Sequence, residues 1–78
     1  MGTRRATEAE KAAYFAMKNT SKNWKAVKNG ADLFYANGAD WRGLDEEFKT
    51  WHAACQRWDA EVAAAGFQVG STGIRKNK

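Results

Sequence analysis

The 78-residue sequence predicts a small single-domain α+β protein, in which a helix, a β-hairpin and a second helix are followed by a flexible basic tail. Three observations predict this fold. An alanine-rich stretch near the start carries a helix-capping signal, an Asn-Gly pair near residue 30 marks a tight turn, and apolar residues repeat at helical spacing between residues 44 and 62. We expect one compact domain over residues 1–66 and a tail over residues 67–78.

The first helix is expected over residues 6–18. Thr7 and Glu10 have the spacing of a capping box, in which the hydroxyl and the carboxylate accept hydrogen bonds from backbone amides left unpaired at a helix start. One face of this helix is apolar and is formed by Ala9, Ala13, Ala16 and Met17.

The hairpin is expected within residues 19–39. Asn29-Gly30 is the preferred pair for a two-residue type I′ turn, because both positions of that turn require positive φ. This turn would place Trp24 opposite Tyr35 on the side that faces the core.

The same stretch also fits two short helices, which would make the protein all-α with three to four helices. Ser21 would cap a helix that Gly30 ends, and Asp32 would cap another that Gly38 ends. The hairpin is favoured because isolated helices this short are weakly self-supporting.

The second helix is expected over residues 41–65, with Asp40 as its N-cap and Gly66 as the residue that ends it. Its apolar residues recur at intervals of three and four and so form one continuous seam. We predict that this seam is the structural core, made of Leu44, Phe48, Trp51, Cys55, Trp58 and Val62.

Charge is divided unevenly along the chain. The net charge is +5 over residues 1–30, −4 over residues 31–65 and +3 over residues 66–78, for a total of +4. This polarity suits a protein that lies between two partners or touches nucleic acid with its ends. The predicted partner or nucleic-acid contacts are Arg4, Arg5, Lys22, Lys25, Lys28, Arg75, Lys76 and Lys78.

A single cysteine excludes an internal disulfide and fits a reducing compartment. No apolar run approaches the roughly 20 residues of a membrane span, and the start lacks the apolar stretch of a signal peptide. We therefore expect a soluble protein of a host cytoplasm or a virion, neither secreted nor membrane-bound.

Catalysis is not predicted. His52 and Cys55 are three residues apart on the second helix, but Cys55 lies in the apolar seam, where a cysteine acts as a small hydrophobe. Together with Asp59, His52 and Cys55 could offer three metal ligands, but one histidine and one cysteine give only weak support for a zinc site. We predict no catalytic residue, no cofactor and no metal.

In this chain an alanine-rich helix is followed by Val27-Lys28-Asn29-Gly30, by Leu33 and Tyr35, and by a helix that opens through Leu44 and Phe48. Over residues 5–65 this order resembles the small head-completion (W-type, head–tail joining) proteins of tailed phages. The resemblance implies a domain built of a helix, a β-hairpin and a second helix. It further implies a non-enzymatic virion part that joins the DNA-filled head at the portal and carries later tail-joining proteins. It also implies a portal or connector partner, oligomerisation on assembly, and a basic tail that becomes ordered there.

Two other functions fit the same features. The small size, the lone cysteine and the richness in aromatic residues suit a small phage-encoded protein that binds and inhibits a host enzyme, such as RNA polymerase or a defence nuclease. Trp24, Tyr35 and Trp41 exceed what the seam needs, and basic residues beside Trp24 (Lys22, Lys25 and Lys28) form a pattern that can bind single-stranded nucleic acid by stacking and charge. The basic ends suit a minor nucleic-acid-binding protein.

Overall fold

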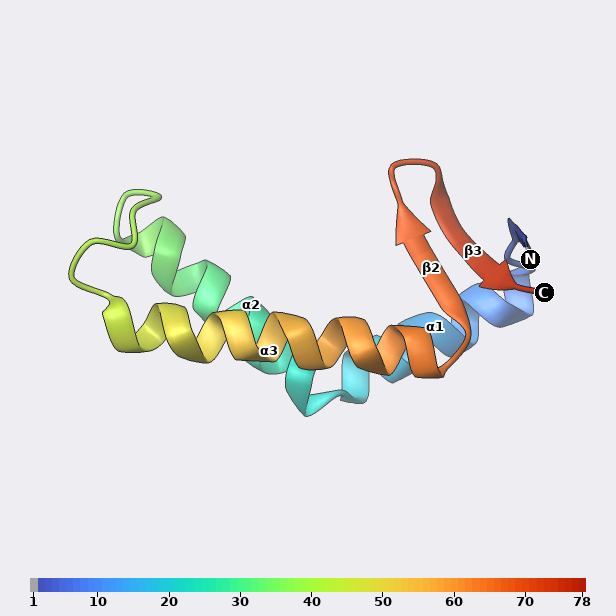
Figure 1. Cartoon of the computed structure of the whole chain (residues 1–78), viewed down its shortest axis with the longest axis horizontal. Helices are drawn as coiled ribbons and strands as arrows, with labels where there is room; N and C mark the ends of the chain where they lie inside the picture. The colour runs from blue at the N-terminus through green and yellow to red at the C-terminus, as the bar shows by residue number, and fades with distance from the viewer. Residues whose placement is uncertain (1) are drawn as a thin grey trace.

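Residues 2–78, the part of the chain that the computed structural model describes, form three helices and one three-stranded antiparallel sheet (Figure 1). In chain order the elements are β1 (Thr3–Arg5), α1 (Glu8–Thr20), α2 (Lys22–Ala36), α3 (Asp45–Ala64), β2 (Phe67–Gly70) and β3 (Gly73–Asn77). The predicted α+β class is confirmed. The predicted order is wrong, because the strands come from the two ends of the chain and not from between the helices.

The start of α1 is formed as predicted. The Thr7 hydroxyl accepts a hydrogen bond from the Glu10 backbone N–H at 3.2 Å, and the Glu10 carboxylate accepts one from the Thr7 N–H at 2.9 Å. The two terminal guanidinium nitrogens of Arg4, Nη1 and Nη2, donate to the same carboxylate at 2.7 Å. The capping box therefore also ties β1 to α1.

The predicted hairpin over residues 24–35 is wrong, because α2 is one continuous helix from Lys22 to Ala36. Ser21 is its N-cap, as in the all-α alternative, but the helix runs through Gly30. A Cβ atom at Gly30 would lie 2.5–2.8 Å from side-chain atoms of Trp51 in α3. This glycine therefore allows two helices to pack closely, and it does not form a turn.

Trp24 and Tyr35 consequently do not pair. Trp24 packs near Trp58 with ring centroids 5.7 Å apart, whereas Tyr35 lies on the outer side of α2 and is 71% exposed. The predicted core-facing position is wrong for Tyr35.

α3 begins later than predicted. Its N-cap is Leu44, which makes no side-chain cap, and the Asp40 carboxylate instead accepts a hydrogen bond from the Arg42 N–H at 3.0 Å in the preceding loop. The end is as predicted, because the helix stops at Ala64 and Gly66 adopts a φ of 83°.

The predicted seam along α3 is only partly covered. Trp58 and Val62 are buried, and Leu44, Trp51 and Cys55 are half-buried. Phe48 is 39% exposed, so its assignment to a closed core is wrong. α2 and Trp41 of the preceding loop pack along this part of α3, in a molecule that measures 43 × 23 × 19 Å. Within residues 2–78, no further helix or strand covers its other side (Figure 1).

The predicted flexible tail is also wrong for residues 67–77, which form β2 and β3. β3 lies in the middle of the sheet, and the strand order is β1-β3-β2. β2 and β3 are joined through a two-residue turn, with Gly70 paired to Gly73. Pairing of β3 with β1, near the other end of the chain, secures the hairpin, which local sequence patterns do not reveal.

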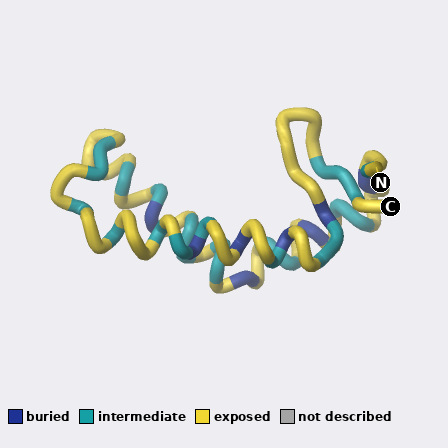
Figure 2. The backbone as a smooth tube through the Cα atoms, in the orientation of Figure 1, coloured by how far each residue is buried: buried dark blue, intermediate teal, exposed yellow. Residues whose placement is uncertain are grey.

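One cluster of buried hydrophobic residues lies where α1, α3 and β2 meet. We call this group the proximal core, made of Tyr14, Trp58, Val62 and Phe67. Figure 2 shows further buried positions along the helices. Tyr14 and Phe67 pack edge to face with centroids 5.5 Å apart, and Tyr14 also lies 6.1 Å from Trp58. None of the helices in residues 2–78 is long and apolar enough to cross a membrane.

Candidate functional site

The end of the molecule away from the sheet is the tip of the α2–α3 pair, joined by residues 37–44 (Figure 1). This loop is held by its own hydrogen bonds. The side-chain amide of Asn37 donates to the backbone carbonyls of Asp40 at 2.9 Å and Arg42 at 3.3 Å. Gly38, Ala39 and Gly43 adopt positive φ angles in this loop, a conformation that glycine takes without a steric penalty. The loop therefore holds Trp41 over the helix pair.

Trp41 contacts three aromatic rings, one of which also contacts Tyr35. We call these five residues the distal aromatic cluster: Phe34, Tyr35, Trp41, Phe48 and Trp51. The Trp41 ring lies 4.9 Å from Phe34, 5.4 Å from Phe48 and 5.2 Å from Trp51, measured between centroids. The indole N–H of Trp51 is buried without a hydrogen-bond partner in the described residues. Trp51 therefore contributes to this cluster through the packing of its ring and not through a hydrogen bond.

The distal aromatic cluster is open to solvent. Tyr35 is 71% exposed and Phe48 39% exposed, and Leu33 beside them is 46% exposed. Trp41 and Phe48, with Asp45 and Lys49, line a shallow hollow of about 420 Å³. In contrast to the proximal core, no member of the cluster is buried (Figure 2). An uncovered group of large aromatic residues is typical of an interaction surface.

The tip that carries this cluster is acidic. Residues 29–50 hold five acidic and two basic side chains, a net charge of −3. Both basic groups have acidic neighbours, since Arg42 pairs with Asp40 and Lys49 lies 3.6 Å from Glu46. The hydrogen bonds from Arg42 hold the pKa of Asp40 below its ordinary value. The part of the predicted acidic middle within residues 31–50 is therefore at one end of the folded molecule, while residues 51–65 continue along α3 to the proximal core.

Three of the eight predicted contact residues are engaged within the fold. Arg4 is bound to Glu10, and this hydrogen bond, together with those from Thr7, lowers the pKa of Glu10 to about 2. Arg75 donates to the Thr3 hydroxyl at 2.7 Å and to its carbonyl at 3.0 Å.

Lys76 is the third. Its ammonium group lies 3.4 Å from the carbonyl oxygens of Ala65 and Gly66 and 5.3 Å from the centre of the Phe67 ring. A cation at this position donates hydrogen bonds to carbonyl oxygens at the end of α3. It also interacts favourably with the negative end of the helix dipole.

The other five predicted contact residues do not gather in one place. Arg5 and Lys78 are exposed near the chain ends, whereas Lys22, Lys25 and Lys28 form an exposed stripe along α2. No sequence pattern marks Lys18, whose ammonium group lies 4.2 Å from the centre of the Trp24 ring.

Cys55 and His52 do not form a pair in which the histidine activates the cysteine thiol. Cys55 is half-buried, and burial followed by the charge of Asp59 raises the pKa of its thiol, which disfavours the reactive thiolate. His52 is exposed and stacks on Phe48 with centroids 5.8 Å apart. Residues 2–78 contain no group of three or more His, Cys, Asp or Glu side chains placed to hold a metal ion.

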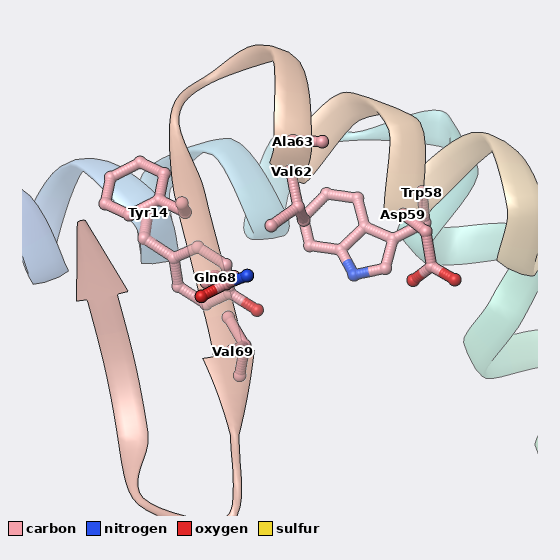
Figure 3. A pocket seen from close by; sticks show the side chains of 8 residues that line it. Tyr14, Trp58, Asp59, Val62, Ala63, Gln68 and Val69 are labelled. Carbon is pink, nitrogen blue, oxygen red and sulfur yellow. The ribbon is translucent and has the colours of Figure 1, made fainter. Parts of the chain in front are cut away.

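A second hollow of about 420 Å³ lies between β2 and α3 (Figure 3). The sequence does not predict it, because the strand that forms one of its sides depends on contacts distant in sequence. It is lined by Tyr14, Trp58, Asp59, Val62, Ala63, Phe67, Gln68 and Val69. We call it the β2–α3 groove. Comparisons of the chain with protein-family models, curated proteins and solved structures gave no match.

Proposed function

We propose that this chain is a non-enzymatic protein-binding part that docks its distal aromatic cluster on a protein partner, in the role of a small head–tail joining protein of a phage particle. The observation that carries the proposal is the exposure of this cluster on a structured tip. Buried aromatic anchors dominate the binding energy of protein interfaces. The portal or connector is the partner that the sequence resemblance implies.

Covering the cluster would release substantial free energy. Burying the exposed half of one aromatic side chain removes about 100 Å² from water, a gross gain of about 2–3 kcal/mol at ~25 cal/mol per Å². Phe48 and Tyr35 both offer such a surface. The loop hydrogen bonds of Asn37 already hold Trp41 in place, so little ordering is required on binding.

The element order of this protein differs from the helix–hairpin–helix that the resemblance implies, because residues 22–36 are helical. Support for the assembly role therefore comes from the surface of the molecule and not from a shared fold. The elongated shape and the opposite charges of its two ends suit a part that lies between two partners.

Inhibition of a host enzyme is the second candidate, and the net charge of −3 at the tip favours it. An acidic surface with aromatic anchors complements the basic channel of an enzyme that binds nucleic acid. Direct binding of nucleic acid would instead use Lys22, Lys25 and Lys28, and its affinity would fall steeply with added salt.

A site-specific photocrosslink tests the proposal. Benzoylphenylalanine is placed at Phe48, and as the matched control at Phe15, which is 48% exposed on α1. In cells that naturally produce the protein, we expect position 48 to crosslink to a structural protein of a particle. A crosslink to a polymerase or nuclease would support the second candidate. If position 48 captures no protein beyond those captured at position 15, the docking role of the cluster is wrong.

A further inference from the structure

β2 is an edge strand with open backbone groups. The Asn77 N–H donates to the Gly66 carbonyl at 2.8 Å, and bonded and non-bonded pairs alternate along an antiparallel ladder. Gln68 and Gly70 therefore bond to β3, whereas the backbone groups of Phe67 and Val69 point away from it. Within residues 2–78, these outward groups make no backbone hydrogen bond outside the sheet.

β2 is a short edge strand, but it carries no charged residue or proline that would oppose pairing. The other edge, β1, places Arg4 and Arg5 along its length. β2 consists of Phe-Gln-Val-Gly, has no charged side chain, and leaves Val69 51% exposed. Natural proteins commonly protect exposed edges with charged residues, so an apolar edge without them is a candidate for strand pairing.

The β2–α3 groove runs beside this open edge. Figure 3 shows Val69 on the strand and Trp58 and Asp59 on the helix, on the two sides of the groove. The floor is apolar, while Asp59 supplies one carboxylate and forms no ion pair in the described part of the chain. Backbone pairing and side-chain burial are therefore available at the same place.

We propose that the β2–α3 groove binds an extended peptide segment of a partner protein, which pairs with β2 as a fourth strand. Main-chain hydrogen bonds to Phe67 and Val69 would supply affinity, and alternate apolar side chains of the segment would enter the groove. A lysine or arginine of the segment would face Asp59, which gives the site its charge preference. The occupant is thus a segment of alternating apolar residues that carries a basic residue.

This site is separate from the distal aromatic cluster, because it lies beside the sheet and the cluster lies at the tip of α2 and α3 (Figure 1). Its existence does not depend on the proposed assembly function. A chain with both surfaces could hold a folded partner at one end and a flexible segment at the other.

Selection from a random dodecapeptide library on the full chain tests the site. We expect enriched peptides to alternate apolar residues and to contain lysine or arginine. Their binding should shift the amide resonance of Val69 more than those of the distal aromatic cluster. Failure to enrich any peptide, or peptides that shift the cluster instead, would overturn the proposal. The same holds if β2 is already paired with a second copy of the chain in solution.

Matched variants and peptides then test the mode of binding. Val69→Lys places a charge on the edge, and Ser71→Lys places the same charge in the adjacent turn. We expect the first to weaken binding by about tenfold and the second by less than about twofold. On the unaltered protein, N-methylation of one set of alternate peptide amides should weaken binding about tenfold, and methylation of the other set should not. Equal effects of the two lysines, or of the two methylation sets, contradict strand pairing.

Discussion

Gly30 of α2 lies directly against Trp51 of α3, so closely that a Cβ atom at residue 30 would stand 2.5 Å from Trp51 Cδ1. This contact explains why a residue that weakens an isolated helix lies in the middle of α2. It also brings the two helices together below the distal aromatic cluster, where Trp51 packs against Trp41.

Gly30→Ala should therefore destabilise the protein, although glycine to alanine usually stabilises a helix. We expect a loss of about 1–3 kcal/mol from overpacking, measured by urea unfolding. Gly70→Ala is the control, because no atom lies within 4 Å of the added Cβ there. In a Trp51→Ala background, which removes the Cγ and Cδ1 atoms but keeps the Cβ atom near residue 30, Gly30→Ala should lose part of its effect. Additive costs would show that the contact with Trp51 is not the cause.

The two ends of the α3 seam should respond differently to truncation. Trp58 is 7% exposed in the proximal core, so Trp58→Ala should cost about 3–5 kcal/mol. Phe48 is 39% exposed, and Phe48→Ala should cost clearly less, about 1 kcal/mol. Thermal unfolding followed by circular dichroism measures both. Equal losses would mean that the distal part of the seam is as closed as the proximal part.

The Arg4–Glu10 pair should make stability depend on pH. The pKa of Glu10 is lowered from 4.5 to about 2 in the folded protein, first by the hydrogen bond from Arg4. A lowered carboxyl pKa stabilises the fold above the unfolded pKa, and this contribution is lost as pH falls from about 5 to about 2. Glu10→Gln and Arg4→Gln should both flatten the decrease in Tm over this range. Profiles parallel to the wild type would contradict the assignment.

Removal of residues 67–78 should unfold the domain. Phe67 belongs to the proximal core and contacts Tyr14. In addition, β3 near the C-terminal end pairs with β1 near the N-terminal end. We expect loss of cooperative thermal unfolding in the truncated chain, whereas removal of Lys78 alone should leave Tm nearly unchanged. A cooperative transition close to the wild-type Tm in the truncated chain would restore the hypothesis of a dispensable tail.

The candidate sites could be predicted from the sequence only in part. Tyr35 and Trp41 stand out as aromatic residues beyond the needs of the seam, and both belong to the distal aromatic cluster. Phe48 was predicted to be core, because periodicity shows that residues share a face but not whether another element covers it. The β2–α3 groove could not be anticipated without the strands that form one of its sides.

The sequence by itself determined those features that depend on near neighbours: the Thr7–Glu10 capping box, the helical character of residues 45–64 and the stop at Gly66. These features rest on hydrogen bonds and φ preferences within a few residues. Only the tertiary structure decided the helical state of Gly30 and the strands near both chain ends. Gly30 packs directly against Trp51 of α3, and Thr3 of β1 pairs with Asn77 of β3. Contacts between residues so distant in sequence can outweigh the local preference of a segment for helix, strand or turn. Patterns within a few residues therefore do not predict them.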